Sequence, residues 1–205
     1  NKNFHKVLFH PATPVQAREL TQLQSILQNQ IKVHGDHVFK NGTMVVPGHV
    51  FYDEEVKFIK LETIHNQVNI ETYLSSLVGK EIKGSTNKIT ALVLHYDVKT
   101  ATDPTTIYVK YTSSSGTLKE FISSEELTCP EIAGLTLKII PTTDYSGASS
   151  ICTVNDGVFY INGYFTNVSK QTITISKYTN LVSAIVGLDY VDSVVTENED
   201  ESLYD

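Results

Sequence analysis

The longest regular pattern in the sequence is helical and lies near the beginning of the chain. Residues 15–34 contain neither Gly nor Pro. Within them, Leu20, Leu23, Leu27 and Ile31 recur at the three- and four-residue spacing that places apolar side chains on one face of a helix. We therefore predict a helix of about 20 residues with a narrow apolar stripe, long for a globular protein.

Residues at both ends of this segment are suited to begin and end a helix. Thr13 and Gln16 have the spacing of a capping box, and Pro14 stands at the first helical position, where the missing amide has no partner to lose. At the other end, Gly35 readily adopts the left-handed conformation in which many helices finish. The helix is therefore predicted to be capped by Thr13 and to end at Gly35.

After the predicted helix, the pattern changes to the alternation of β-strands interrupted by short turns. Asn41-Gly42 between two β-prone runs predicts a hairpin of strands 37–40 and 43–46. In residues 56–61 apolar and basic residues largely alternate, so one face of that strand is expected to be wet. A further strand is expected at 50–52, and a short helix capped by Asn69 at 69–77.

The middle of the chain reads as short strands separated by turns, a pattern typical of a small barrel or meander. Asn162-Gly163 later repeats the Asn-Gly signal after an aromatic residue, which suggests that the first and last thirds are similar β units in one sheet. Strands are expected at 80–84, 88–98, 106–112 and 118–122, and, after a loop at 144–150, at 151–154, 158–165, 172–175, 184–188 and 190–195.

These elements predict an α+β protein that is mainly β, with a long N-terminal helix, antiparallel β units and a small barrel-like or meander block in the middle. Residues 1–77 are expected to form the helix and a hairpin unit, and residues 78–143 the central block. Residues 144–205 are expected to form a C-terminal β unit that packs with 1–77. The acidic, polar end of the chain is expected to be an exposed connector.

The composition excludes several classes of protein. Of 205 residues, 40% are hydrophobic and 19% are charged, so the chain can bury a core and is not a disordered tail. A formal net charge of -7 argues against a general nucleic-acid binder, which needs concentrated Lys and Arg. No apolar run approaches the roughly 20 residues of a membrane span, so no membrane insertion is expected.

The beginning of the chain and its cysteines bear on origin and compartment. The chain starts without Met and without the apolar core of a signal peptide, which suggests a fragment or a processed product. Cys129 and Cys152 are too few for a disulfide scaffold. They are expected to be reduced core thiols, with a bridge between them left open.

Candidate chemistry is sparse, because the sequence has no nucleophile elbow, phosphate-binding loop or paired-Cys zinc motif. His34 and His37, with His49 near them, are weak candidates for a metal site, since a threefold axis would bring copies of one imidazole together. The alternative is a polar helix–strand corner, and no metal or cofactor is assigned. The acidic run 53–55 lacks a second group for acid–base chemistry, so a solvated turn and no enzyme are expected.

The narrow stripe on the predicted helix has two interpretations. The helix either lies on its own sheet or clusters with copies of itself around an axis, where glutamines hydrogen-bond across the seam. The stripe is too short for a free-standing coiled coil of three or four heptads. In the second interpretation, the oligomer interface consists of Leu20, Leu23, Leu27, Gln30 and Ile31.

A resemblance to a known family favours the second interpretation. Residues 14–48, PVQARELTQLQSILQNQIKVHGDHVFKNGTMVVPG, resemble an uncharacterised domain that recurs in large structural proteins of tailed bacteriophages, notably contractile-tailed marine phages. The closing stretch VGLDYVDSVVTENEDESLYD also looks like the end of that domain. The middle block, residues 78–143, carries little of its signature.

The resemblance implies a non-enzymatic virion structural protein of a tail fibre or baseplate, which anchors or assembles the fibre through a trimeric helix seam. The implied partners are further copies, other tail or baseplate proteins and, through other domains, the host surface. The implied location is the virion tail, after assembly in the host cytoplasm. Two other functions stay open: a carbohydrate- or receptor-binding β module that uses exposed aromatic side chains, and a depolymerase fragment, which would need clustered carboxylates in a groove.

Overall fold

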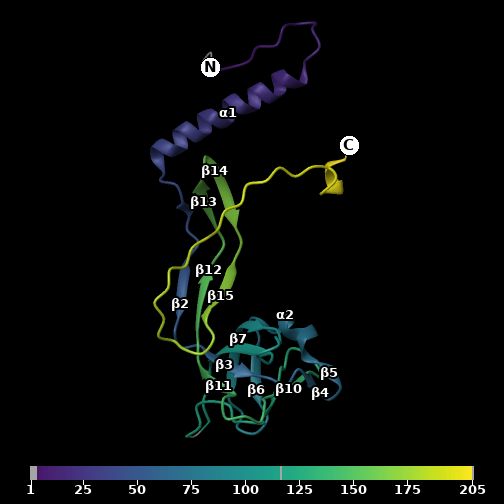
Figure 1. Ribbon diagram of the computed structural model, residues 1–205, viewed down its shortest axis with the longest axis vertical. Coiled ribbons are helices and arrows are strands. Elements are labelled where there is room, and N and C mark those ends of the chain that lie inside the picture. Colours follow the sequence, from purple (N-terminus) through teal and green to yellow (C-terminus); the bar gives the residue numbers. More distant parts are fainter. Residues whose placement is uncertain (1–3, 116, 205) are drawn as a thin grey trace.

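The computed structural model describes residues 4–115 and 117–204 of the chain, and the molecule is elongated (Figure 1). Helix α1 (Ala17–Val38) lies across one end, a narrow β stem forms the middle, and a compact β body forms the other end. Strands account for 34% of the chain and helices for 16%, and the sheets are antiparallel. The mainly β class with antiparallel sheets is therefore confirmed.

The body, residues 56–149, is built on an open antiparallel sheet of seven strands in the order β10-β9-β6-β7-β8-β3-β11. The sheet does not close into a barrel, and only β6, β7 and β8 follow one another as a meander. The strands are β3 (Lys57–Lys60), β6 (Glu81–Gly84), β7 (Thr90–Asp97), β8 (Thr106–Tyr111), β9 (Glu126–Thr128), β10 (Thr136–Lys138) and β11 (Ser146–Ala148).

The body has its own hydrophobic core, covered by the short helical segment predicted after residue 69. Asn69 Oδ1 accepts a hydrogen bond from the amide of Glu71 at 3.0 Å, which confirms the predicted cap. Ile70, Leu74 and Leu77 from this segment are fully buried in the core. The segment comprises η1 (Ile70–Tyr73) and α2 (Leu74–Leu77), and it follows the two-stranded ribbon of β4 (Ile64–His65) and β5 (Val68–Asn69).

Residues 118–122, predicted as a strand, form a loop instead, apart from one isolated bridge between Ser115 and Leu118. The loop is held by Glu125, whose side chain is buried. Its carboxylate accepts hydrogen bonds from the amides of Thr86, Asn87 and Ile122 and from Asn87 Nδ2, at 3.0–3.1 Å. A charge-assisted network of this kind replaces the ladder of hydrogen bonds that a strand would have made.

Strand β3 is covered on both faces, so the prediction that one face is wet is wrong. Lys60 is only 8% exposed, and its Nζ lies 2.6 Å from Asp144 Oδ2 and 4.9 Å from the centre of the Tyr178 ring. The ammonium group is tolerated there because a carboxylate and an aromatic face replace its water. Hydrogen bonding by Lys60 in turn lowers the pKa of Asp144.

The stem is a three-stranded ribbon whose central strand pair, β12 and β13, spans about 40 Å at the usual rise per residue. Two sheets, β1-β13-β14 and β15-β12-β2, follow each other along it. Where they meet, Gly48 allows close approach, since a Cβ there would lie 2.5 Å from the carbonyl oxygen of Asn155. The strands are β1 (Thr43–Val46), β2 (Val50–Asp53), β12 (Ser150–Val154), β13 (Gly157–Ile161), β14 (Tyr164–Val168) and β15 (Gln171–Ser176).

The predicted hairpin of residues 37–40 and 43–46 is wrong, because residues 37 and 38 still belong to α1. Strand β1 pairs instead with β13, and the Asn-Gly hairpin of the stem is the one at 162–163, between β13 and β14. The two Asn-Gly turns meet, since Asn41 Oδ1 accepts from the amide of Asn162 at 2.9 Å. Segments from the first and last thirds of the chain thus share both stem sheets, while the division into three parts remains a prediction.

Helix α1 begins and ends differently from the prediction. The residue before its first turn is Gln16, whose amide donates to Glu19 Oε2 at 3.0 Å, whereas Thr13 Oγ1 lies beside the His10 ring. Gly35 lies inside the helix, which continues to Val38. The prediction of a helix from its apolar spacing is therefore correct, but the predictions of its first and last residues are wrong.

Residues 184–188 and 190–195, predicted as strands, are extended but join no sheet in the part of the chain that the structure describes. We call residues 181–195 the strap, because this segment runs back along the stem from the body toward α1 (Figure 1). After the strap, a single helical turn, η2 (Glu201–Leu203), precedes the end of the chain. Strand-like alternation without a partner strand produced the incorrect prediction.

Both cysteines are buried and unpaired, in different parts of the molecule. Cys129 belongs to the body core, and Cys152 lies on β12 in the stem, opposite Tyr52 and Ile173. The structure therefore agrees with reduced core thiols rather than with a bridge.

Candidate assembly surface

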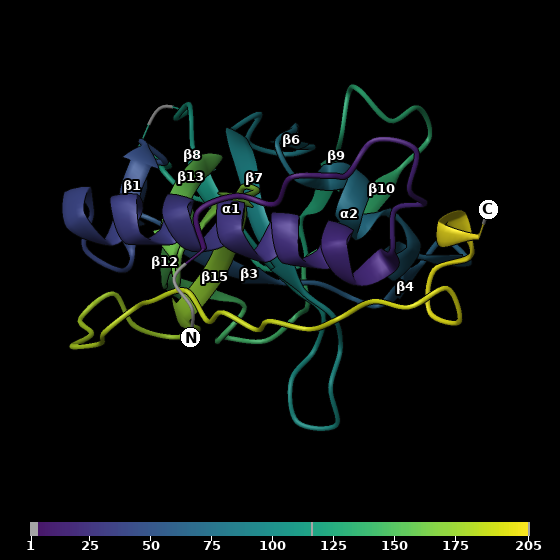
Figure 2. The same ribbon diagram turned by 90° about the horizontal axis from the view of Figure 1, so that it is seen from above.

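The apolar stripe of α1 faces outward rather than onto the chain's own sheets. Leu20, Leu27 and Ile31 are 55%, 50% and 47% exposed, and Leu23 is half-buried. The segment before the helix runs back along it (Figure 2), where Gln30 Nε2 approaches the carbonyl oxygen of His5 at 3.5 Å. Gly35 is the only buried residue of α1, and of the five predicted interface residues four are exposed and Leu23 alone is partly covered.

One tyrosine of the stem fixes the C-terminal half of α1. The Tyr160 hydroxyl donates to Asp36 Oδ1 at 2.7 Å and lies 3.0 Å from the carbonyl oxygen of Lys32. Burial and the neighbouring Asp36 raise the pKa of Tyr160 to about 12, and the same hydrogen bond lowers the pKa of Asp36. The Tyr160 ring packs with Phe39 and Phe165, whose centroids are 5.6 and 5.4 Å away.

Gly35 is needed for this contact, because a Cβ at that position would lie 2.5 Å from Tyr160 Cε2. We expect Gly35→Ala to loosen α1 from the stem. The overlap costs roughly 1–3 kcal/mol, more than the gain of about 1 kcal/mol in helix propensity. Amide hydrogen exchange at residues 157–163 should become faster while the circular dichroism of the helix is kept. Gly187→Ala, where a Cβ meets open space, is the control; unchanged exchange in Gly35→Ala would contradict the contact.

Large apolar side chains are also exposed on the stem. Phe51 and Tyr52 on β2 and Tyr164 and Phe165 on β14 are each about half exposed. A ribbon of three strands has two faces and no second sheet to cover either of them, so these side chains stay in contact with water in a single chain.

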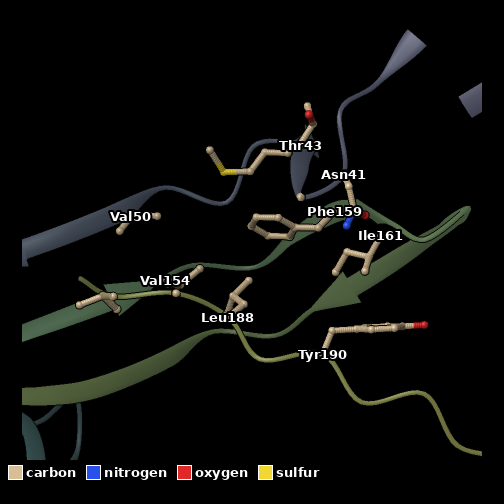
Figure 3. Close-up of a pocket in the computed structure, with 12 residues that line it drawn as sticks. Asn41, Thr43, Val50, Val154, Phe159, Ile161, Leu188 and Tyr190 are labelled. Atoms are coloured by element: carbon tan, nitrogen blue, oxygen red, sulfur yellow. The ribbon is translucent and has the colours of Figure 1, made fainter. Parts of the chain in front are cut away.

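The strap covers only part of the stem. Val186, Leu188 and Tyr190 approach the ribbon, and a groove of about 580 Å³ remains between them and stem residues that include Val50 and Phe159 (Figure 3). Other side chains of the strap remain open to solvent. Its most exposed members are Leu181, Ile185, Val191 and Val194.

Buried and exposed apolar residues are distributed unevenly along the molecule. All but four of the buried ones belong to the body; the exceptions are Ile151, Cys152, Phe159 and Tyr160. The exposed large ones show the opposite distribution, because all but seven lie outside the body. Those seven are Ile64, Val68, Tyr73, Val78, Val98, Leu118 and Ile122.

The total surface reflects this distribution. The chain exposes 13765 Å², whereas a compact monomer of 22.8 kDa exposes about 9,600 Å². A permanent protein–protein interface buries about 1,000–2,500 Å² on each partner, so the difference of about 4,000 Å² exceeds what one such interface needs. Helix, stem and strap together therefore form an extended apolar surface, which we call the assembly surface.

The weaker candidates from the sequence do not combine into a site. His34 and His37 are exposed on the last turns of α1, and residues 4–115 and 117–204 contain no group of three His, Cys, Asp or Glu side chains arranged to hold a metal ion. In the acidic run, Asp53 and Glu55 form ion pairs with Lys110 at 2.9 and 3.1 Å. These two carboxylates link the stem to the body, a role that the sequence pattern did not indicate.

A second polar cluster joins the end of the stem to the body. Asp97 Oδ2 accepts from the Tyr108 hydroxyl at 2.8 Å and lies 2.9 Å from Lys177 Nζ, while His95 stacks on the Tyr108 ring. Burial alone would raise the pKa of Asp97, but the hydrogen bonds from Lys177 and Tyr108 outweigh it and the pKa is lowered. Burial lowers the pKa of His95, against the opposing charge of Asp97.

These shifts predict that acid weakens the folded chain in two steps. Because His95 binds a proton less readily when folded, stability falls as the pH drops below about 6.5, by at most about 1.4 kcal/mol per pH unit. The lowered pKa of Asp97 adds a further loss below about pH 4. In urea titrations between pH 7 and 5, His95→Gln should flatten the slope and His10→Gln, at an exposed position, should not. Equal slopes in both variants would contradict the assignment.

Comparison of the chain with protein-family models, with curated proteins and with solved structures gives no match. Among the described residues, no helix is both long and apolar enough to cross a membrane.

Proposed function

We propose that the chain is a structural assembly module, which associates with further copies of itself through the assembly surface. The sequence resemblance to structural proteins of phage tails supports a tail fibre or baseplate setting, and a trimer built on the α1 stripe. The body serves as a folded unit at one end, and α1, the stem and the strap supply the contacts. In this proposal the chain has no catalytic role.

The observation that carries the proposal is the excess of exposed surface, concentrated on elements that lack a core of their own. A 22-residue helix with one buried residue gains little from tertiary packing, which is the main source of helix stability in proteins. Association would cover the helix stripe and the two stem faces together. Large apolar side chains that are exposed together on neighbouring elements are typical of interaction surfaces.

Light scattering on the full chain over a range of concentrations tests this proposal. We expect a mass of about three times 22.8 kDa, the mass of one chain, because three helices can share one axis with their stripes facing inward. A constant mass of one chain at all concentrations would exclude self-association.

The half-exposed aromatic residues of the stem support a second candidate, a carbohydrate- or receptor-binding module. Aromatic faces such as those of Phe51, Tyr52, Tyr164 and Phe165 can stack on sugar rings. Binding of the purified chain to a glycan array or to host cells would favour this function. The assembly proposal predicts no such binding, because neighbouring copies cover these faces.

A further inference from the structure

The strap has apolar side chains that line the stem groove and others that its own chain leaves almost fully exposed. Side chains of an extended segment point alternately in opposite directions. Leu188 and Tyr190 turn toward the stem groove, beside Ile161 (Figure 3). Ile185 and Val191 are 102% and 80% exposed, and Val191 borders a second, shallow groove beside Thr166 and Gln171 of the stem. We call Ile185 and Val191 the outer row of the strap.

The backbone of the strap is also open. Within the part of the chain that the structure describes, residues 182–195 make no backbone–backbone hydrogen bond. An extended apolar segment with free amides and carbonyls is well suited to pair with, or be covered by, another polypeptide. The strap therefore has the features of an interface segment that rests on its own stem and is completed by a second polypeptide.

Charge complementarity indicates a second copy of this chain as the partner. Residues 181–204 carry no Lys or Arg, and the described residues form no ion pair with their carboxylates; the acidic residues are Asp189, Asp192, Glu197, Glu199, Asp200 and Glu201. In contrast, the segment 4–40 has more basic than acidic residues. It contains Lys6, Arg18, Lys32 and Lys40 against Glu19 and Asp36.

From these observations we infer that the strap is an inter-subunit clamp, with its inner side on its own stem and its outer row covered by a second copy. This inference rests on the proposed self-association and adds a contact distinct from the helix seam. The size of the exposed surface supports it. About 4,000 Å² in excess of a compact monomer is more than the four apolar residues of the α1 stripe can account for.

The test combines hydrogen–deuterium exchange with paired variants of the full chain. In the associated protein, amides of residues 182–195 should exchange at least tenfold more slowly than in the same protein diluted to single chains. Ile185→Asp/Val191→Asp should raise the dissociation constant at least tenfold in light scattering. Ser75→Asp/Ser76→Asp, which adds the same charge at exposed positions of the body, should leave that constant within twofold of the parent value. Circular dichroism and thermal unfolding of the body verify that both variants fold.

The outcomes separate the clamp from the proposed function. If the parent chain associates but residues 182–195 exchange at the same rate in both states and the outer-row variant matches its control, the clamp is wrong and self-association survives. If the parent chain has the mass of one chain at every concentration, self-association fails and the clamp fails with it.

Discussion

Leu27→Asp should convert the associated protein into single chains. Leu27 occupies the middle of the α1 stripe and is half exposed in one chain. In a symmetric seam, every copy places the new carboxylate in the same dry layer, and each buried, unpaired charge costs several kcal/mol. Light scattering should give a mass of 22.8 kDa, the mass of one chain. The helical circular dichroism should fall as well, because α1 loses its main packing partner.

Gln22→Asp is the matched control, since it adds the same charge to the same helix. At 100° per residue, position 22 lies about 140° from position 27, away from the stripe. This variant should keep the parent mass. A Leu27→Asp protein that still elutes at the parent mass would place the association elsewhere on the molecule and remove α1 from it.

Glu125→Ala should be the most destabilising polar substitution in the body. The carboxylate joins the turn at residues 86–87 to the loop at Ile122 through four hydrogen bonds, and the side chain is 3% exposed. Its removal leaves several amides without an acceptor where water enters poorly. The expected loss in the free energy of unfolding is about 3 kcal/mol, measured by urea titration.

Glu126→Ala provides the comparison at a neighbouring position. The Glu126 side chain is 50% exposed, and its carboxylate lies 3.3 Å from His65 Nε2. Its removal should cost about 1 kcal/mol or less, as for other exposed ion pairs. If both variants lost similar amounts of unfolding free energy, the burial of Glu125 would not be the reason for its contribution to stability.

The local patterns predicted much of the secondary structure and little of its pairing. Helical spacing located α1, and Asn69 located the short body helix, because both signals depend on residues close in sequence. The partner of β1 lies more than 110 residues away on β13, and an Asn-Gly turn alone does not say which strand follows it. The burial of Lys60 likewise depends on Asp144 and Tyr178, which are far away in the sequence and so could not be predicted from the residues around Lys60.

The candidate surface could be predicted only in part for the same reason. The stripe on α1 is visible as a spacing of leucines, and the structure places it facing outward. Gly35 looked like a helix terminus, but its lack of a side chain serves the close approach of Tyr160, a residue 125 positions later. Apolar alternation in the strap suggested strands, although such alternation shows only that two sides differ and not what covers each of them.

The two buried thiols offer separate reporters of opening in the two halves of the molecule. Cys129 becomes reactive only when the body core opens, and Cys152 only when the central stem strand leaves its neighbours. Because neither is paired, a thiol reagent followed by mass spectrometry labels each at its own rate. If packing against further copies stiffens the ribbon, the labelling rate of Cys152 falls as the protein concentration rises. The labelling rate of Cys129 stays the same.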